Sequence, residues 1–269
     1  MLPNFLGIGV QRSATTWLYE CLREHPEIFL PEQKELHFFN RNFDKGLDWY
    51  KAFFQGVKGE KAIGEITPDY LHNYEALKRI AMIIPKAKLI ISLRNPVDRA
   101  YSAYKLLSTR VYKDISFDEA FWQKDYIRKV GFYYNHLRRL YELFPEDQIL
   151  VILYDDILSS PKKILTNMFV FLDVNPNFSP KALTKKYNKI LFPNVQNLLV
   201  SIGLGGILSF IKNSKCGDLI KKLFFYLENL RTIKHDKKDF TRYIEVYRED
   251  ILNLQNLIQR DLSSWLKSS

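Results

Sequence analysis

Short apolar segments alternate with helical periodicity along the first 175 residues, and this alternation limits the possible folds more than any other feature. Four segments are predicted strands: Phe5–Val10, Ala62–Glu65, Lys88–Leu93 and Gln148–Leu153. They lack the in–out alternation of a strand with one wet face, so both faces are expected to be buried. Buried strands separated by helices form a parallel sheet with helices on both sides, so the sequence predicts a three-layer α/β domain.

The predicted helices carry apolar residues three and four positions apart, and two of them have clear boundary signals. Thr15–Glu24 is predicted to end at His25, because a residue that precedes proline disfavours helical backbone angles. Asn95 is a preferred N-cap residue, and Pro96 suits the first position of the helix that follows. These signals place a helix directly after the first and the third predicted strands.

The C-terminal third has a different character, because strand signals fade after about residue 175. An apolar stripe over Ile244–Ile258 predicts a helix that packs back on the body. Leu198–Ile211 is either a pair of core or lid helices or an interfacial membrane contact, since no window reaches the ~18 apolar residues of a membrane span. We expect one domain, with an α/β core over 1–175 and a mostly helical extension over 176–269.

The charge balance favours an anionic ligand, because 40 lysines and arginines face 30 acidic residues, a net charge of +10. No nucleic-acid recognition motif accompanies this charge, so nucleic acid is not expected as a partner. The two cysteines and five scattered histidines have neither disulfide-framework nor metal-ligand spacing, so no metal is expected. Without a leader pattern at the N-terminus, the expected setting is cytoplasmic.

The segment Gly9–Trp17 follows the first strand with small and hydroxyl residues and then enters a helix. A strand, a short loop and a helix N-terminus bind phosphate well, because backbone N–H groups and the helix dipole converge on the anion. Arg12 adds a full charge, and Thr15 and Thr16 add hydroxyl donors. Walker A spacing is absent. The segment is either a phosphate-binding loop or an ordinary turn with a surface arginine.

A second anion-binding candidate follows the strand Lys88–Leu93. Arg94 leaves the carboxyl end of that strand, where ligands bind in parallel sheets, and Ser102 lies about two helical turns further on. Arginine gives phosphate a bidentate contact. The sequence therefore predicts two phosphate sites at the ends of two parallel strands.

These segments together resemble the sulfotransferases that use 3′-phosphoadenosine 5′-phosphosulfate (PAPS), especially the heparan sulfate N- and 3-O-sulfotransferases and their bacterial relatives. Arg12–Thr16 resembles the family's K-x-G-T-T loop for the 5′-phosphosulfate, and Arg94–Ser102 resembles its 3′-phosphate motif. Lys34–Phe39 resembles the K-E-x-H-F-F run. Further matching segments are Lys45–Tyr50, Glu65–Tyr70 and Gly131–Leu137. The resemblance covers Leu6–Val174 in consistent order.

The resemblance implies a P-loop-NTPase-like fold, PAPS as the sulfuryl donor and the desulfated nucleotide PAP as a product, with 1–175 binding the nucleotide and 176–269 on the acceptor side. Residues at matching positions are implied to bind the donor: Arg12, Ser13, Ala14, Thr15, Thr16, Trp17, Arg94 and Ser102. Glu35 matches the family's proposed base, and His37 is the alternative base or an orienting residue. Arg12 is also implied to stabilise the charge on the leaving phosphate.

The chain departs from the family pattern at several positions. Arg12 replaces a lysine, and Ala14 replaces a glycine, which suits alanine only if φ is negative. Ile66 stands where heparan 3-O-sulfotransferases carry lysine, and only Tyr187–Lys189 lies near the expected adenine loop. The expected acceptor is a hydroxyl or amine, as of a glycan or glycolipid. A lipid or small-molecule acceptor, or a non-catalytic PAP-binding scaffold, stays open.

Two further acidic residues have open roles. Glu65 and Asp69 follow the second predicted strand and either touch the acceptor or pair locally.

For Glu35, burial beside aromatic residues raises the expected pKa, while the neighbouring charges of Lys34 and Arg12 lower it.

Overall fold

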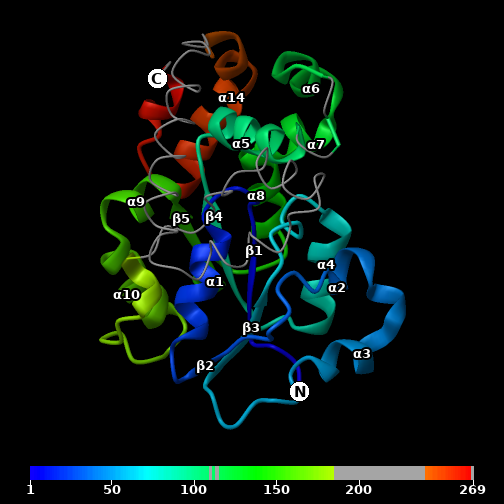
Figure 1. Ribbon diagram of the computed structural model, residues 1–269, viewed down its shortest axis with the longest axis vertical. Coiled ribbons are helices and arrows are strands. Elements are labelled where there is room, and N and C mark those ends of the chain that lie inside the picture. The colour runs from blue at the N-terminus through cyan, green and yellow to red at the C-terminus, as the bar shows by residue number, and fades with distance from the viewer. Residues whose placement is uncertain (109–110, 113–114, 185–239, 268–269) are drawn as a thin grey trace, which may run out of the picture.

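The computed structural model describes residues 1–108, 111–112, 115–184 and 240–267 (Figure 1). Its centre is a five-stranded sheet in the order β2-β3-β1-β4-β5, in which every neighbouring pair is parallel. The strands are β1 Phe5–Gly9, β2 Ile28–Phe29, β3 Ala62–Ile66, β4 Lys88–Leu93 and β5 Ile149–Leu153. Four of them were predicted, within one residue of the observed ends. Only the two-residue β2 is additional, because it is too short to show a pattern.

Helices cover both faces of the sheet (Figure 1). The described α-helices are α1 Thr15–Arg23, α2 Phe38–Arg41, α3 Gly46–Ala52, α4 Tyr74–Ile83, α5 Pro96–Ser108, α6 Phe117–Gln123, α7 Asp125–Arg128, α8 Tyr133–Tyr141, α9 Tyr154–Ser159, α10 Pro161–Phe171 and α14 Thr241–Ile258. Short 3₁₀ turns are Phe43–Lys45, Lys129–Gly131, Glu146–Gln148, Lys181–Thr184 and Ser263–Leu266. None of the helices in the described part of the chain is long and apolar enough to cross a bilayer.

The side chains of each strand alternate between two separate cores. In β4, Leu89 and Ile91 pack on the face covered by α2, α4, α5, α8 and α14, whereas Ile90 packs on the face covered by α1, α9 and α10. Both faces of the inner strands are thus buried, which explains their nearly continuous apolar sequence. The predicted three-layer α/β architecture is confirmed.

The predicted helix boundaries around β4 and at the C-terminus also agree with the structure. Asn95 Oδ1 accepts hydrogen bonds from the backbone N–H groups of Val97 at 3.0 Å and Asp98 at 3.3 Å, so it caps α5. Helix α14 buries Tyr247 and Ile251 against the body. The segments Leu198–Ile211 and Tyr187–Lys189 lie outside the described residues.

Candidate active site

The candidate site lies at the carboxyl ends of the central strands. Strand β1 has β3 on one side and β4 on the other, so the loops that follow these three strands diverge around a crevice. Gly9 ends β1, and a Cβ there would lie 2.8 Å from Leu71, so the absence of a side chain lets the chain after β3 approach closely. The topology therefore gathers segments that are far apart in the sequence.

The loop after β1 has the form of an anion cradle. Helix α1 begins at Thr15, and the first N–H groups of a helix have no partner within it. Arg12 and Ala14 both have left-handed backbones, with φ of 71° and 63°. The condition under which alanine suits this position, a negative φ, is therefore not met, because the turn into α1 needs the left-handed region that the family's glycine adopts freely. Ser92 Oγ anchors the loop by donating to the carbonyl oxygen of Ser13 at 2.6 Å.

Two residues of this loop that were predicted to bind the donor have buried side chains. The side chain of Trp17 packs in the core on the α1 face of the sheet. Ser13 is fully buried, and its Oγ has no hydrogen-bond partner among the described residues. Donor binding by these two residues stays a prediction.

The two predicted phosphate segments are in direct contact. Arg12 Nε donates to Ser102 Oγ at 3.0 Å, and Arg94 Nη1 donates to the carbonyl oxygen of Arg12 at 3.4 Å. The Arg94 guanidinium also lies over the ring of Tyr154, 4.6 Å from its centroid, while its buried Nε has no partner among the described residues. Burial and the nearby charge of Arg94 lower the pKa of Arg12. Two arginines this close favour an anion between them.

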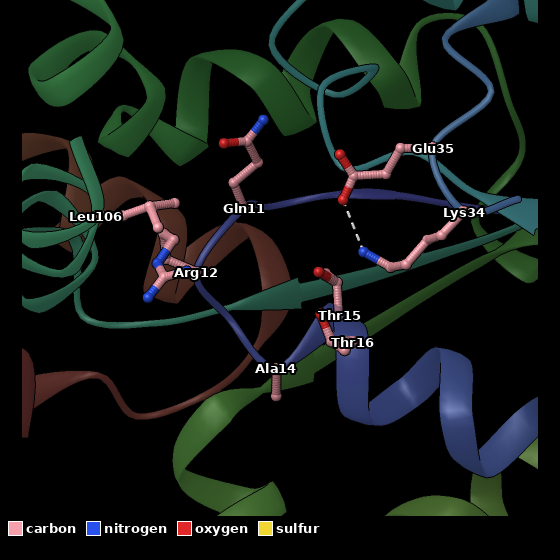
Figure 2. A pocket seen from close by; sticks show the side chains of 8 residues that line it. All are labelled: Gln11, Arg12, Ala14, Thr15, Thr16, Lys34, Glu35 and Leu106. Carbon is pink, nitrogen blue, oxygen red and sulfur yellow. Dashed lines mark hydrogen bonds and ion pairs between the residues drawn. The ribbon is translucent and has the colours of Figure 1, made fainter. Parts of the chain in front are cut away.

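A cavity of about 140 Å³ opens beside the loop. Its lining residues are Gln11, Arg12, Ala14, Thr15, Thr16, Lys34, Glu35 and Leu106. Figure 2 shows Lys34 and Glu35 reaching toward one another near Thr15 and Thr16, while Arg12 turns toward Leu106 on α5. Lys34 Nζ lies 2.7 Å from Glu35 Oε1. The predicted base therefore lies in the same cavity as the phosphate loop, paired with a lysine.

His37 and Asp69 form the other wall of the crevice. Glu35 and His37 both have left-handed backbones, with φ of 63° and 52°, and non-glycine residues of this kind concentrate at functional sites. Asp69 accepts hydrogen bonds from Gln11 Nε2 and, at 2.8 Å, from Arg41 Nη2. Burial is the main effect on Asp69 and raises its pKa.

Glu65 is a buried structural carboxylate. It accepts hydrogen bonds from Thr67 Oγ1 at 2.6 Å, Tyr70 Oη at 2.8 Å and Tyr50 Oη at 3.1 Å. Burial raises its pKa, and the three hydroxyl donors act in the opposite direction. Of the two roles left open for Glu65, the structure supports local pairing.

Three residues of the crevice had no assigned role from the sequence alone: Gln11, Arg41 and Tyr126. Burial raises the pKa of Tyr126 to about 12, and the nearby carboxylates of Asp69 and Glu35 raise it further. Gln11 lies within the loop after β1, so its position in the sequence could have marked it as a site residue. No sequence pattern marked Arg41 or Tyr126, because only the fold brings α2 and α7 to this crevice.

The chain has the groups that an anionic nucleotide requires. The first N–H groups of α1, the hydroxyls of Thr15 and Thr16 and the unpartnered Nε of Arg94 are all donors around one crevice. Among the described residues, no group of three or more histidine, cysteine, aspartate or glutamate side chains gathers as a metal site. The fold and site define an α/β protein that binds anionic groups at the carboxyl ends of its strands.

A family model described as the sulfotransferase domain matches residues 2–202, so the chain belongs to the sulfotransferase family. A crystal structure of a sulfotransferase from Alicyclobacillus acidocaldarius superposes with a TM-score of 0.73 at 26% identity, covering 99% of this chain and 100% of that one. The predictions of sulfotransferase membership and of a P-loop-NTPase-like fold are confirmed.

Two curated relatives share part of the chain. Bifunctional heparan sulfate N-deacetylase/N-sulfotransferase 3 of Mus musculus is 35% identical over 206 residues, which are 68% of this chain and 24% of the relative. Heparan sulfate glucosamine 3-O-sulfotransferase 3B1 of Homo sapiens is 32% identical over 183 residues, 64% of this chain and 46% of the relative. The chain thus spans about a quarter and about half of the length of these relatives.

Proposed function

We propose that the protein transfers the sulfuryl group of PAPS to a hydroxyl or amine of a carbohydrate acceptor. The observation that carries the proposal is the contact between the two segments beside the N-terminus of α1, where Arg12 donates to Ser102 and Arg94 donates to the carbonyl oxygen of Arg12. A nucleotide with anionic groups at two ends needs two clusters of donors within one crevice. The crevice supplies both.

PAPS supplies an activated sulfuryl group attached to a phosphate, and each cluster of donors then has its own task. The N–H groups at the start of α1, with Thr15 and Thr16, hold the phosphosulfate end and stabilise the charge that develops on the leaving phosphate oxygen. Arg94 and Ser102 hold the 3′-phosphate, with the planar guanidinium giving a bidentate contact. Arg12 lies between the two and serves both ends.

Glu35 is the proposed base, since it lines the cavity that contains Thr15 and Thr16. An acceptor hydroxyl loses its proton as its oxygen attacks sulfur, and a carboxylate within hydrogen-bond reach accepts that proton. The ammonium of Lys34 lies 2.7 Å from Glu35 Oε1 and leaves Oε2 as the oxygen that accepts the proton. Lys34 then supplies a cation at the sulfuryl end of the cavity.

The acceptor class rests on the relatives and on charge. The named activities of both curated relatives concern heparan sulfate, an acidic glycan, and a net charge of +10 favours such a partner. We propose an acidic glycan as the acceptor, with residues 176–269 on the acceptor side. The cytoplasmic setting stays a prediction.

A transfer assay with [³⁵S]PAPS against a panel of glycans, lipids and phenols, with PAP binding measured in parallel, tests the proposal. We expect PAP to bind and label to enter an acidic glycan. Label in a lipid or phenol only would overturn the acceptor class. PAP binding without transfer to any acceptor would identify a scaffold, and the absence of PAP binding would overturn the proposed function.

A further inference from the structure

His37 lies between two carboxylates in the crevice. Its Nε2 is 3.7 Å from Glu35 Oε2, and its Nδ1 is 3.9 Å from Asp69 Oδ2. Nδ1 is buried and has no hydrogen-bond partner among the described residues. An imidazole nitrogen that is shielded from water and aimed at a carboxylate is an unsatisfied polar group, and catalytic hydrogen bonds of this kind often shorten when substrate binds.

Asp69 is held in a fixed position opposite His37. Its side chain is only 4% exposed, and one oxygen accepts from Gln11 Nε2 while the other accepts from Arg41 Nη2 at 2.8 Å. The charged or titratable groups that face His37 and Asp69 from the surrounding segments are Lys34, Glu35, Arg41 and Tyr126. Gln11, from the loop after β1, and Arg41, from α2, thus hold this carboxylate, which is not among the residues that line the cavity with Thr15 and Thr16.

We propose that Asp69 is a positioning residue that holds His37 in the tautomer with its proton on Nδ1, so that His37 Nε2 takes the acceptor's proton onward from Glu35. This inference rests on the proposed sulfuryl transfer. A proton on Nδ1, directed at Asp69 Oδ2, leaves a lone pair on Nε2 that faces Glu35 Oε2. The arrangement follows the general rule that a carboxylate on one imidazole nitrogen fixes the role of the other.

The proton balance of the step is simple. The acceptor O–H bond breaks, its electron pair forms the new bond to sulfur, and the proton passes to Glu35. The bond between sulfur and the leaving phosphate oxygen breaks, and that electron pair stays on the oxygen. Glu35 then gives the proton to His37 Nε2, which leaves an imidazolium between the ionised Glu35 and Asp69. Glu35 is thereby restored as a base before the product leaves.

Asp69→Asn is the direct test, because it keeps the size of the side chain and removes the charge that favours a proton on Nδ1. We expect kcat to fall about 10- to 100-fold, the usual effect of losing a carboxylate that orients a histidine, while PAP affinity stays within about twofold. In a His37→Gln background the same substitution should have no further effect, since Asp69 acts through His37. Asp48→Asn is the matched control, because it removes an exposed carboxylate of α3 that pairs with Lys51 and leaves His37 and the contacts of Asp69 in place.

The inference would be overturned if the losses of kcat from Asp69→Asn and His37→Gln added up in the double variant, or if Asp48→Asn lost as much kcat as Asp69→Asn. The second readout needs no turnover. Imidazole ¹⁵N shifts of the wild-type protein, assigned by the signal lost in His37→Gln, should show the Nδ1–H tautomer of neutral His37. The Nε2–H tautomer would refute the inference even if Asp69→Asn does not fold. If the wild type neither binds PAP nor transfers sulfate while His37 shows the Nδ1–H tautomer, the proposed function fails and the positioning of His37 stands.

Discussion

Arg12 and Ser102, which are 90 positions apart in the sequence, are joined by a 3.0 Å hydrogen bond from the guanidinium Nε to the serine hydroxyl. The bond connects the loop after β1 to helix α5 after β4, and β1 and β4 are neighbours in the sheet. The two segments with phosphate-binding character therefore form one crevice. Had they lain on opposite sides of the molecule, no single nucleotide could have reached both.

Arg12→Ala should lower both turnover and donor affinity. The substitution removes the cation that contacts Ser102 and lines the cavity beside Thr15. We expect kcat to fall about 10²–10³-fold, the usual effect of losing a donor to a developing charge. Steady-state assays with PAPS and calorimetric binding of PAP measure the two effects. Leu106→Ala, another residue of the cavity wall, is the control and should have a small effect, whereas unchanged turnover in Arg12→Ala would refute the assignment.

Arg94→Ala should raise the KM for PAPS more than it lowers kcat, because Arg94 is assigned to the 3′-phosphate rather than to the reacting sulfur. We expect an increase of about 10- to 100-fold, in line with the ~1.5–3 kcal/mol typical of a charged hydrogen bond. To test whether Arg94 binds the 3′-phosphate, the effect of Arg94→Ala is measured with PAPS and with adenosine 5′-phosphosulfate, a donor that lacks the 3′-phosphate. The variant should lose little with that donor, and equal losses with both donors contradict the assignment.

Glu35→Gln should bind PAP as the wild type does and transfer little sulfate. Glutamine keeps the size of the side chain but cannot accept a proton from the acceptor, so kcat should fall about 10²–10⁴-fold. PAP calorimetry and single-turnover transfer separate binding from chemistry. Glu32→Gln, at an exposed position in the same segment, is the matched control. Turnover near the wild-type level in Glu35→Gln would remove this residue as the base and favour His37.

Ala14→Gly should stabilise the protein. Alanine pays about 1–2 kcal/mol for a left-handed backbone that glycine adopts freely, and the greater freedom of glycine in the unfolded chain offsets about half of that gain. We expect a net gain of about 0.5–1 kcal/mol in the free energy of unfolding. Ala100→Gly, within the buried face of α5, is the control and should cost about 1 kcal/mol or more. A loss of stability in Ala14→Gly would contradict the proposed strain.

His72 and His136 should destabilise the folded state as the pH drops from 6.5 to 4. Burial lowers the pKa of each from 6.5 to about 4. At these two histidines the unfolded chain binds more protons than the folded chain across this range, so they favour folding above pH 6.5 and lose that contribution toward pH 4. Burial raises the pKa of Asp250 from 3.8 to about 6 and also raises the pKa values of Glu65 and Asp69, so these carboxyl groups act in the opposite direction, and substitution of a histidine isolates its own contribution.

Denaturant unfolding at several pH values measures this slope. Each histidine contributes up to about 1.4 kcal/mol per pH unit within the range, and the partial exposure of both rings makes the real value smaller. His72→Gln should flatten the slope, whereas His25→Gln, at a histidine whose Nε2 already has a backbone partner at 3.0 Å, should not. An unchanged slope in His72→Gln would show that His72 is not the group responsible.

The sequence by itself determined the layers of the fold and the strand–loop–helix form of the segment Gly9–Trp17. Strands such as Lys88–Leu93 are apolar on both faces, and that pattern depends only on local burial, so it is readable without coordinates. The cap at Asn95 and the contacts around Arg12 likewise depend on residues close in sequence or on the ends of predicted strands. Ala14 is the exception, because its φ is set by the turn that joins β1 to α1.

Only the tertiary structure decided which side chains face one another in the crevice. The side chain of Trp17 packs in the core on the α1 face, a placement that depends on how α1 lies on the sheet. Asp69 and Arg41 come from segments 28 positions apart, and neither segment's local pattern predicts the contact of 2.8 Å between them, which the fold brings about. Spacing along the chain carries information about helix faces and strand ends, whereas contacts between loops depend on the order of the strands.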